Sequence, residues 1–232
     1  YLSAEKAEQL KRLPLKINFK PESHAEGTAT YFREYLREQL KPIIKAIEDD
    51  KGEEIDLYTA GLKIYTTIDS RMQQYAEEAV EEHLSNLQPE FNRRQKDNPT
   101  APFLDITPDE TQKIMNSAMK NSERWRIMSI NGKSDTEIKQ SFEVPAKMKI
   151  FTWKGERDTI MKPKDSILYY KHFLQTGMMA MEPQTGHVKA WVGGINYKYF
   201  QYDHVGQGAR QVGSTFKPFV YATAFAEGYT PE

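Results

Sequence analysis

The chain has 232 residues, and with 38% hydrophobic and 12% aromatic residues it can form a folded core. Lysine and arginine number 32 against 33 aspartates and glutamates, and this net charge of −1 argues against a general nucleic-acid-binding protein. The absence of cysteine excludes disulfides and thiolate nucleophiles, and no apolar stretch is long enough to predict a membrane helix. Because the sequence starts at Tyr1 and ends after a turn without a closing element, we expect a soluble piece of a longer protein.

Two helices and a strand-helix unit are predicted in the first part of the chain. Residues 3–13 predict a short helix that Ser3 caps and Pro14 ends. Residues from Thr28 onward predict an amphipathic helix with one apolar stripe: Phe32, Leu36, Leu40, Ile43 and Ile47. The charged run 48–54 ends it. Residues 61–68 alternate and are rich in β-branched side chains, so they predict a strand.

Asp69 is then expected to cap a helix. The apolar face predicted for that helix comprises Met72, Tyr75, Ala76, Ala79, Val80, His83 and Leu87. Residues 88–104, with three prolines, predict a long loop. Thr107 and Glu110 form a capping-box pattern with Pro108 between them, which predicts a helix to about Asn121.

Three strands are predicted next, at 126–130, 137–143 and 148–153, and they would form a small β-rich insert. Asp165 is expected to cap a further helix, whose aromatic residues indicate burial; its apolar or aromatic members are Ile167, Tyr170, His172 and Phe173. Residues 178–182 and 187–192 predict a β-hairpin, and a last helix is predicted from Ser214 to Phe225. The fold class predicted is therefore α+β.

Metal and phosphate chemistry find no support in the sequence. The five histidines are scattered, at 24, 83, 172, 187 and 204, and no two have the spacing of a helical zinc site. No phosphate-binding glycine loop is present, and paired carboxylates such as Glu77 and Glu78 are typical of a solvated helix face. We expect no cofactor and no metal.

The pattern that carries chemistry is Ser-x-x-Lys, which places a hydroxyl and an amine one helical turn apart, so that a deprotonated lysine can activate the serine. It occurs at Ser3, at Ser117 and at Ser214. The first lies in a charged terminal helix, where Lys6 would stay solvated, and the second lies at the frayed end of a polar helix.

Ser214 and Lys217 differ, because apolar residues surround them in the sequence and because Pro218 is tolerated only in the first turn of a helix. Ser214 is thereby placed at a helix N-terminus, where free backbone N–H groups favour developing negative charge. The alternative is a serine that only caps a core helix.

Residues 210–221, Arg-Gln-Val-Gly-Ser-Thr-Phe-Lys-Pro-Phe-Val-Tyr, resemble the active-serine segment of class A penicillin-binding proteins. Residues 181–194 resemble the hairpin that opens the transpeptidase domain of that family, and residues 61–69 its linker unit. The resemblance implies four regions: a glycosyltransferase tail (1–27), an interdomain linker (28–90), a variable β-rich insert (91–163) and the start of the transpeptidase domain (164–232).

The same resemblance implies an acyl-transfer enzyme. Ser214 is expected to attack the D-Ala-D-Ala end of a peptidoglycan stem peptide, with Lys217 as general base, and β-lactams are expected to trap the serine. The parent protein would be membrane-anchored, with this region on the outer, periplasmic side, and cell-wall synthesis proteins are possible partners.

Two further motifs of the family, Ser-x-Asn and Lys-Thr-Gly, do not follow Lys217. We therefore expect the 232 residues alone not to be a competent transpeptidase. Two alternatives stay open: a docking or spacer module without catalysis, and another serine acylase such as a β-lactamase or penicillin sensor. The linker resemblance argues against the second.

Overall fold

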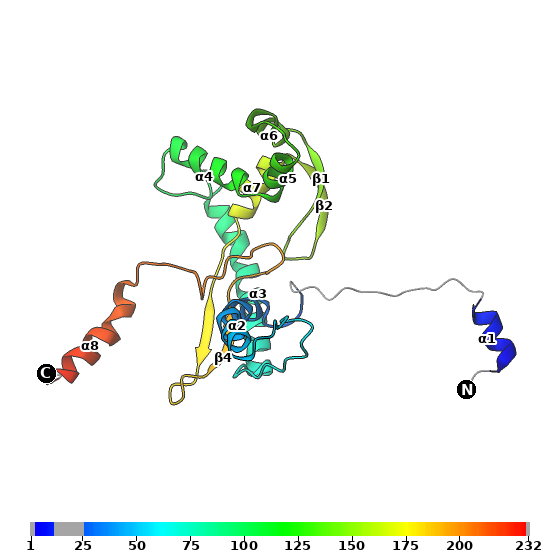
Figure 1. Cartoon of the computed structure of the whole chain (residues 1–232). Helices are drawn as coiled ribbons and strands as arrows, with labels where there is room; N and C mark the ends of the chain where they lie inside the picture. The colour runs from blue at the N-terminus through cyan, green and yellow to red at the C-terminus, as the bar shows by residue number, and fades with distance from the viewer. Residues whose placement is uncertain (1–2, 12–25, 231–232) are drawn as a thin grey trace.

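The computed structural model describes residues 3–11 and 26–230 (Figure 1). Its helices are α1 (Ala4–Lys11), α2 (Thr30–Lys51), α3 (Ser70–Arg94), α4 (Pro108–Lys120), α5 (Glu123–Ile130), α6 (Asp135–Ser141), α7 (Pro163–Lys171) and α8 (Lys217–Ala226), with a 3₁₀ turn η1 (Gly213–Phe216) directly before α8. Its strands are β1 (Ala146–Ile150), β2 (Arg157–Met161), β3 (Met178–Met181) and β4 (Val188–Val192). The predicted α+β class is confirmed.

One core lies where the N-terminal half of α3 packs on the hairpin β3–β4. These two strands are antiparallel, with Met178 opposite Val192 and an irregularity after Ala180. Ala76, Ala190 and Val192 are buried together, and Val80 and Ala180 pack against them. Helix α2 contacts β4 as well. The hairpin is therefore held by two helices from the first third of the chain.

A second core lies at the other end of α3, where Figure 1 shows α4–α7 and the curved hairpin β1–β2 gathered together. It is built from Met119, Trp125, Ile138 and Phe142, with Met128 and Ile167 packed against them. Strands β1 and β2 pair antiparallel, from Ala146 opposite Met161 to Ile150 opposite Arg157. Helix α3 thus connects two separately packed units.

Several local signals are confirmed. The Ser3 hydroxyl accepts from the Lys6 N–H at 3.4 Å at the start of α1, although residues 12–14 lie outside the described part. Asp69 accepts from the first N–H groups of α3, and the capping box of Thr107 and Glu110 starts α4. The hairpin β3–β4 and the helix after Ser214 form where they are predicted.

The predicted β-rich insert is wrong. Residues 126–130 and 137–143 do not form strands, because they belong largely to α5 and α6. Serine caps explain the difference: Ser122 caps α5, and Ser134 forms a capping box with Glu137 at the start of α6. Only the third predicted strand corresponds to a real one, β1, and its partner β2 was not predicted. The region is mainly helical.

Three further predictions around α3 need correction. Residues 61–68 form no strand, although the end of this segment lies beside β4: the Thr67 hydroxyl donates to the Val188 carbonyl at 2.7 Å, and the Asp69 N–H donates to the Lys189 carbonyl at 3.0 Å. Residues 88–94 are not a loop, because α3 continues through Pro89 to Arg94. The buried face of α3 is also rotated from the predicted one; its buried residues are Gln73, Ala76, Leu84 and Gln88.

Helix α7 begins earlier than predicted. Lys162 is its N-cap and Pro163 its first residue, so Asp165 lies inside the first turn and is not the cap. The aromatic side chains of α7 are half-buried, as their number indicated.

Candidate functional site

Ser214 and Lys217 lie on one continuous helical segment. Ser214 is in η1, and the backbone N–H of Lys217, the first residue of α8, donates to the Ser214 carbonyl. In a 3₁₀ turn the side chains of residues three apart lie over one another, so the hydroxyl and the amine share one face. Gly213 enters the turn with φ +51°, a left-handed conformation that glycine adopts without strain. The backbone thus presents the predicted pair.

The surroundings of this pair are open. Ser214 and Lys217 are exposed, and no hydrogen bond joins their side chains in the described part of the chain. The apolar residues expected around Lys217 are exposed too, with Phe219 at 65% and Val220 at 54%. The residues that would enclose the lysine are therefore not supplied by η1 and α8 themselves.

The other two Ser-x-x-Lys matches have ordinary structural places. Ser3 caps α1, and Ser117 and Lys120 are exposed at the end of α4. The Lys120 ammonium lies 6.0 Å from the ring centre of Trp125, which is typical of a surface cation–π contact.

A buried aspartate shapes the loop that precedes the serine segment. Asp203 is only 7% exposed, and its carboxylate accepts from the Trp191 indole N–H at 3.0 Å and from the N–H groups of Val205 at 2.9 Å and Gly206 at 3.1 Å. The next residue, His204, donates its N–H to the Gly193 carbonyl. The loop is therefore tied to the end of β4.

The position of His204 in this loop shifts the pKa of its imidazole. Burial, and secondarily the positive charge of Arg210, lower the pKa of His204 below its ordinary value. The neutral imidazole is favoured next to the loop that leads to Ser214.

Tyr31 of α2 packs on the two glycines that follow β4. A Cβ atom at Gly193 would lie 2.7 Å from the Tyr31 ring, and one at Gly194 would collide with the Tyr31 hydroxyl, so both positions require glycine. That hydroxyl donates to the Phe200 carbonyl, and burial raises the pKa of Tyr31 above its ordinary value. Tyr35, one turn later, stacks on Trp191 with ring centres 4.7 Å apart.

The side chain of Gln73, in α3, hydrogen-bonds to the backbone of β4. Its side chain is fully buried; it accepts from the Trp191 N–H at 2.7 Å and donates to the Trp191 carbonyl at 2.9 Å and to Glu77 at 2.8 Å. The Asp69 N–H donates to the Lys189 carbonyl at 3.0 Å on the same edge. Lys189 and Trp191 are two residues apart in β4, so their backbone groups face the same edge of the strand. The contacts from Asp69 and Gln73 therefore cover the edge of β4 that does not pair with β3.

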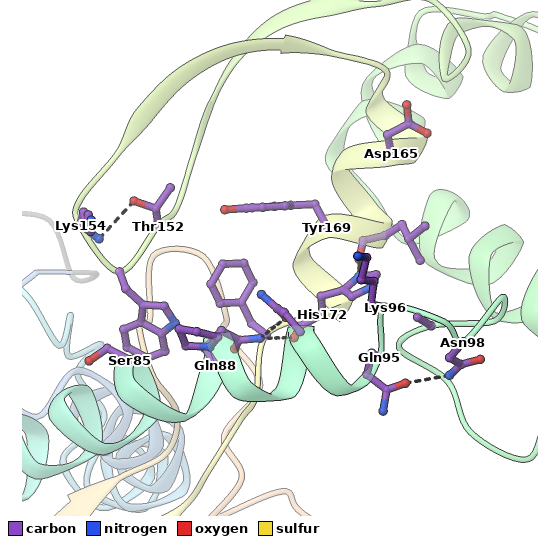
Figure 2. Close-up of a pocket in the computed structure, with 16 residues that line it drawn as sticks. Ser85, Gln88, Gln95, Lys96, Asn98, Thr152, Lys154, Asp165, Tyr169 and His172 are labelled. Atoms are coloured by element: carbon purple, nitrogen blue, oxygen red, sulfur yellow. Dashed lines mark hydrogen bonds between the residues drawn. The ribbon is translucent and has the colours of Figure 1, made fainter.

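A cavity of about 780 Å³ lies between α3, the loop after it, the β1–β2 turn and α7 (Figure 2). Gln88 fixes its geometry, because its amide donates to the His172 carbonyl at 2.8 Å and accepts from the Leu174 N–H at 2.9 Å. The sequence prediction missed Gln73, Gln88, Asp203 and this cavity. Of these, only Asp203 left a signal: an aspartate three residues before a glycine is typical of a turn.

Within the described residues, no group of three or more histidine, aspartate or glutamate side chains could hold a metal ion. No described helix is both long and apolar enough to cross a membrane.

Residues 98–174 match the family described as penicillin-binding protein middle domain. Over its whole length, the chain is 27% identical to penicillin-binding protein 1A of Rickettsia bellii, and it covers 30% of that protein. Penicillin-binding proteins 1A of Neisseria flavescens and Rickettsia prowazekii are 26% and 29% identical over 88% of the chain, which covers 27% of each. The chain thus spans less than a third of these relatives. The resemblance predicted from the sequence is confirmed.

Proposed function

We propose that this chain forms the interdomain linker and the beginning of the transpeptidase domain of a class A penicillin-binding protein, a peptidoglycan synthase, and that Ser214 is its acylated serine. The observation that carries the proposal is the turn that places Ser214 and Lys217 on one face at the start of α8. The hairpin segment (181–194) and the serine segment (210–221) follow one another in the order that the resemblance implies. The predicted boundaries near residues 27, 90 and 163 remain predictions.

The reaction is an acyl transfer. The Ser214 Oγ attacks the carbonyl of the penultimate D-Ala, Lys217 Nζ removes the serine proton, and the terminal D-Ala leaves with a proton. An amine of a neighbouring stem peptide then attacks the ester and releases the serine. Backbone N–H groups at the N-terminus of the helix stabilise the negative charge on the carbonyl oxygen. A β-lactam acylates the same serine: its ring C–N bond breaks as the ester forms, and this ester is hydrolysed only slowly.

In this proposal the parent protein is anchored in the cytoplasmic membrane and this region works on its outer side, where the peptidoglycan stem peptides are. The 232 residues alone are a poor transpeptidase, because Ser214 and Lys217 are exposed and nothing described encloses the lysine.

Labelling with a fluorescent penicillin tests the serine. In the longer parent protein, Ser214→Ala is expected to abolish labelling, whereas Ser117→Ala, at the end of α4, leaves it intact. The isolated 232 residues are expected to label slowly and incompletely. Labelling of the parent that persists after Ser214→Ala would contradict the assignment, and rapid stoichiometric labelling of the isolated chain would contradict the statement about its competence.

A docking or spacer role is a second candidate, favoured by where the chain is well packed. Both cores and the closed edge of β4 lie outside η1 and α8, whose residues are almost all exposed. Capture of purified cell-wall synthesis proteins by the chain, unchanged by Ser214→Ala, supports this role. No capture, with penicillin labelling intact in the parent, counts against it.

A further inference from the structure

The cavity between α3 and α7 has an aromatic wall. In Figure 2, Tyr169 extends from α7 across the cavity toward Thr152 in the β1–β2 turn. Its ring meets Tyr170 and Phe173 in edge contacts, with interplanar angles of 74° and 76°, and it has no stacked partner in the described part of the chain. The Tyr169 hydroxyl donates to the Phe151 carbonyl at 2.7 Å, which fixes the ring in place. A flat apolar group of a ligand can therefore stack there.

Two lysines supply free hydrogen-bond donors to this cavity. Lys96 and Lys154 line the cavity from the two sides that Figure 2 shows, and neither ammonium has a partner among the described residues. Asp165, at the outer edge, is the one carboxylate of the lining. The lining therefore has a surplus of positive charge.

His172 adds an acceptor. Its Nδ1 lies 2.9 Å from the Leu168 carbonyl, and because a carbonyl only accepts, Nδ1 carries the proton and Nε2 is the acceptor in the neutral ring. A ligand that offers hydroxyl donors, carbonyl acceptors and an acidic group would satisfy all these side chains.

We propose that this cavity is a binding site for an acidic, N-acetylated saccharide. The C–H face of a sugar ring stacks on Tyr169, its acetamido carbonyls and carboxylates accept from Lys96 and Lys154, and a hydroxyl donates to His172. The volume of about 780 Å³ is within the usual range of small-ligand sites. The inference rests on the proposed function in one respect, the choice of glycan; the stacking ring and the free donors do not depend on it.

A peptide segment is the competing occupant, and the ring geometry argues against it. An extended peptide would bind through its acidic groups to the two lysines and would not have to stack on the Tyr169 ring. The two ligands are distinguished by their dependence on the ring.

The test is calorimetric titration of the full chain with a purified disaccharide tetrapeptide from uncross-linked peptidoglycan, in parallel with the free tetrapeptide and with chitotetraose, a neutral N-acetylated sugar. We expect saturable binding of the disaccharide tetrapeptide, weaker binding of chitotetraose, and the weakest binding of the tetrapeptide. Tyr169→Leu should weaken binding of both sugars at least fivefold, whereas Tyr169→Phe, which keeps the ring, should change it less than twofold.

Charge is tested with a matched pair of double variants. The double variant Lys96→Ala with Lys154→Ala should weaken binding of the acidic ligand about three- to tenfold and change the affinity for chitotetraose by less than about twofold. Lys113→Ala with Lys139→Ala, exposed lysines that do not line the cavity, should change neither. If circular dichroism shows that Tyr169→Leu does not fold, the double variant of Lys96 and Lys154 still tests the proposal.

The inference is overturned if the sugars do not saturate, if the free tetrapeptide binds as tightly as the disaccharide form, or if the lysine pair has no effect on the acidic ligand. Penicillin labelling of Ser214 is measured separately. A cavity that binds no saccharide leaves that labelling unaffected, and an unlabelled Ser214 leaves the titration unaffected, so the two failures are distinguishable.

Discussion

Replacing Gln73 tests how α3 holds β4. Gln73→Ala removes three hydrogen bonds and leaves the N–H and the carbonyl of Trp191 without their partner. Each buried group left unpaired costs about 1–3 kcal/mol. Since water entering the vacated space can bind one of the two again, we expect the free energy of unfolding to fall by about 2–4 kcal/mol.

The matched control is Gln74→Ala on the exposed side of the same turn. Among the described residues the Gln74 side chain bonds only to Glu78, so this change is expected to cost less than about 0.5 kcal/mol. The assay combines urea unfolding with hydrogen exchange of the Trp191 amide, which reports on the hydrogen bond itself. Undiminished protection of that amide in Gln73→Ala, or equal destabilisation by the two variants, would refute the role given to Gln73.

Two further predictions concern close packing and pH. Gly194→Ala should destabilise the chain by about 1–3 kcal/mol in thermal unfolding, because the new methyl group collides with the Tyr31 hydroxyl. Adding Tyr31→Phe should restore part of the lost stability. A double variant no more stable than Gly194→Ala would argue against this contact. Hydrogen bonds from Ser134, and then from Lys133, lower the pKa of Glu137 to about 2, so its stabilisation of α6 is complete above about pH 4.5 and is lost as the pH falls toward 2. Glu137→Gln should remove this part of the acid dependence of helicity, and an unchanged pH profile would contradict it.

Local signals predicted the fold best where one side chain determines one element. Asp69, Thr107 and Ser214 each mark the start of a helix, and the structure starts α3, α4 and η1 within one residue of them. The same rule applies at Ser122 and Ser134, although the alternating apolar residues that follow them predict strands. A serine N-cap forms a local hydrogen bond to the first turn of its helix, and a short alternating segment has no comparable local hydrogen bond. The serines are therefore the stronger signal of secondary structure here.

Long-range packing could not be predicted in this way. The buried face of α3 was expected to be apolar, yet Gln73 and Gln88 occupy it, because each satisfies backbone groups of segments more than 80 residues away. A buried amide in such a place is favourable only when its partners are present, and a sequence alone does not show those partners. The Ser214 pair was predictable for the opposite reason, since the serine and the lysine lie within one turn.

These long-range contacts converge on Trp191. Its backbone bonds to Gln73 of α3, its ring stacks on Tyr35 of α2, and its indole N–H donates to Asp203 in the loop before the serine segment. A displacement of α2, through ring stacking, or of α3, through hydrogen bonds, is therefore passed to that loop through Trp191. If this path matters for acylation, changes at Gln73 that leave Ser214 and Lys217 untouched should slow penicillin labelling of the parent protein, with His204 and Asp203 as the first groups displaced.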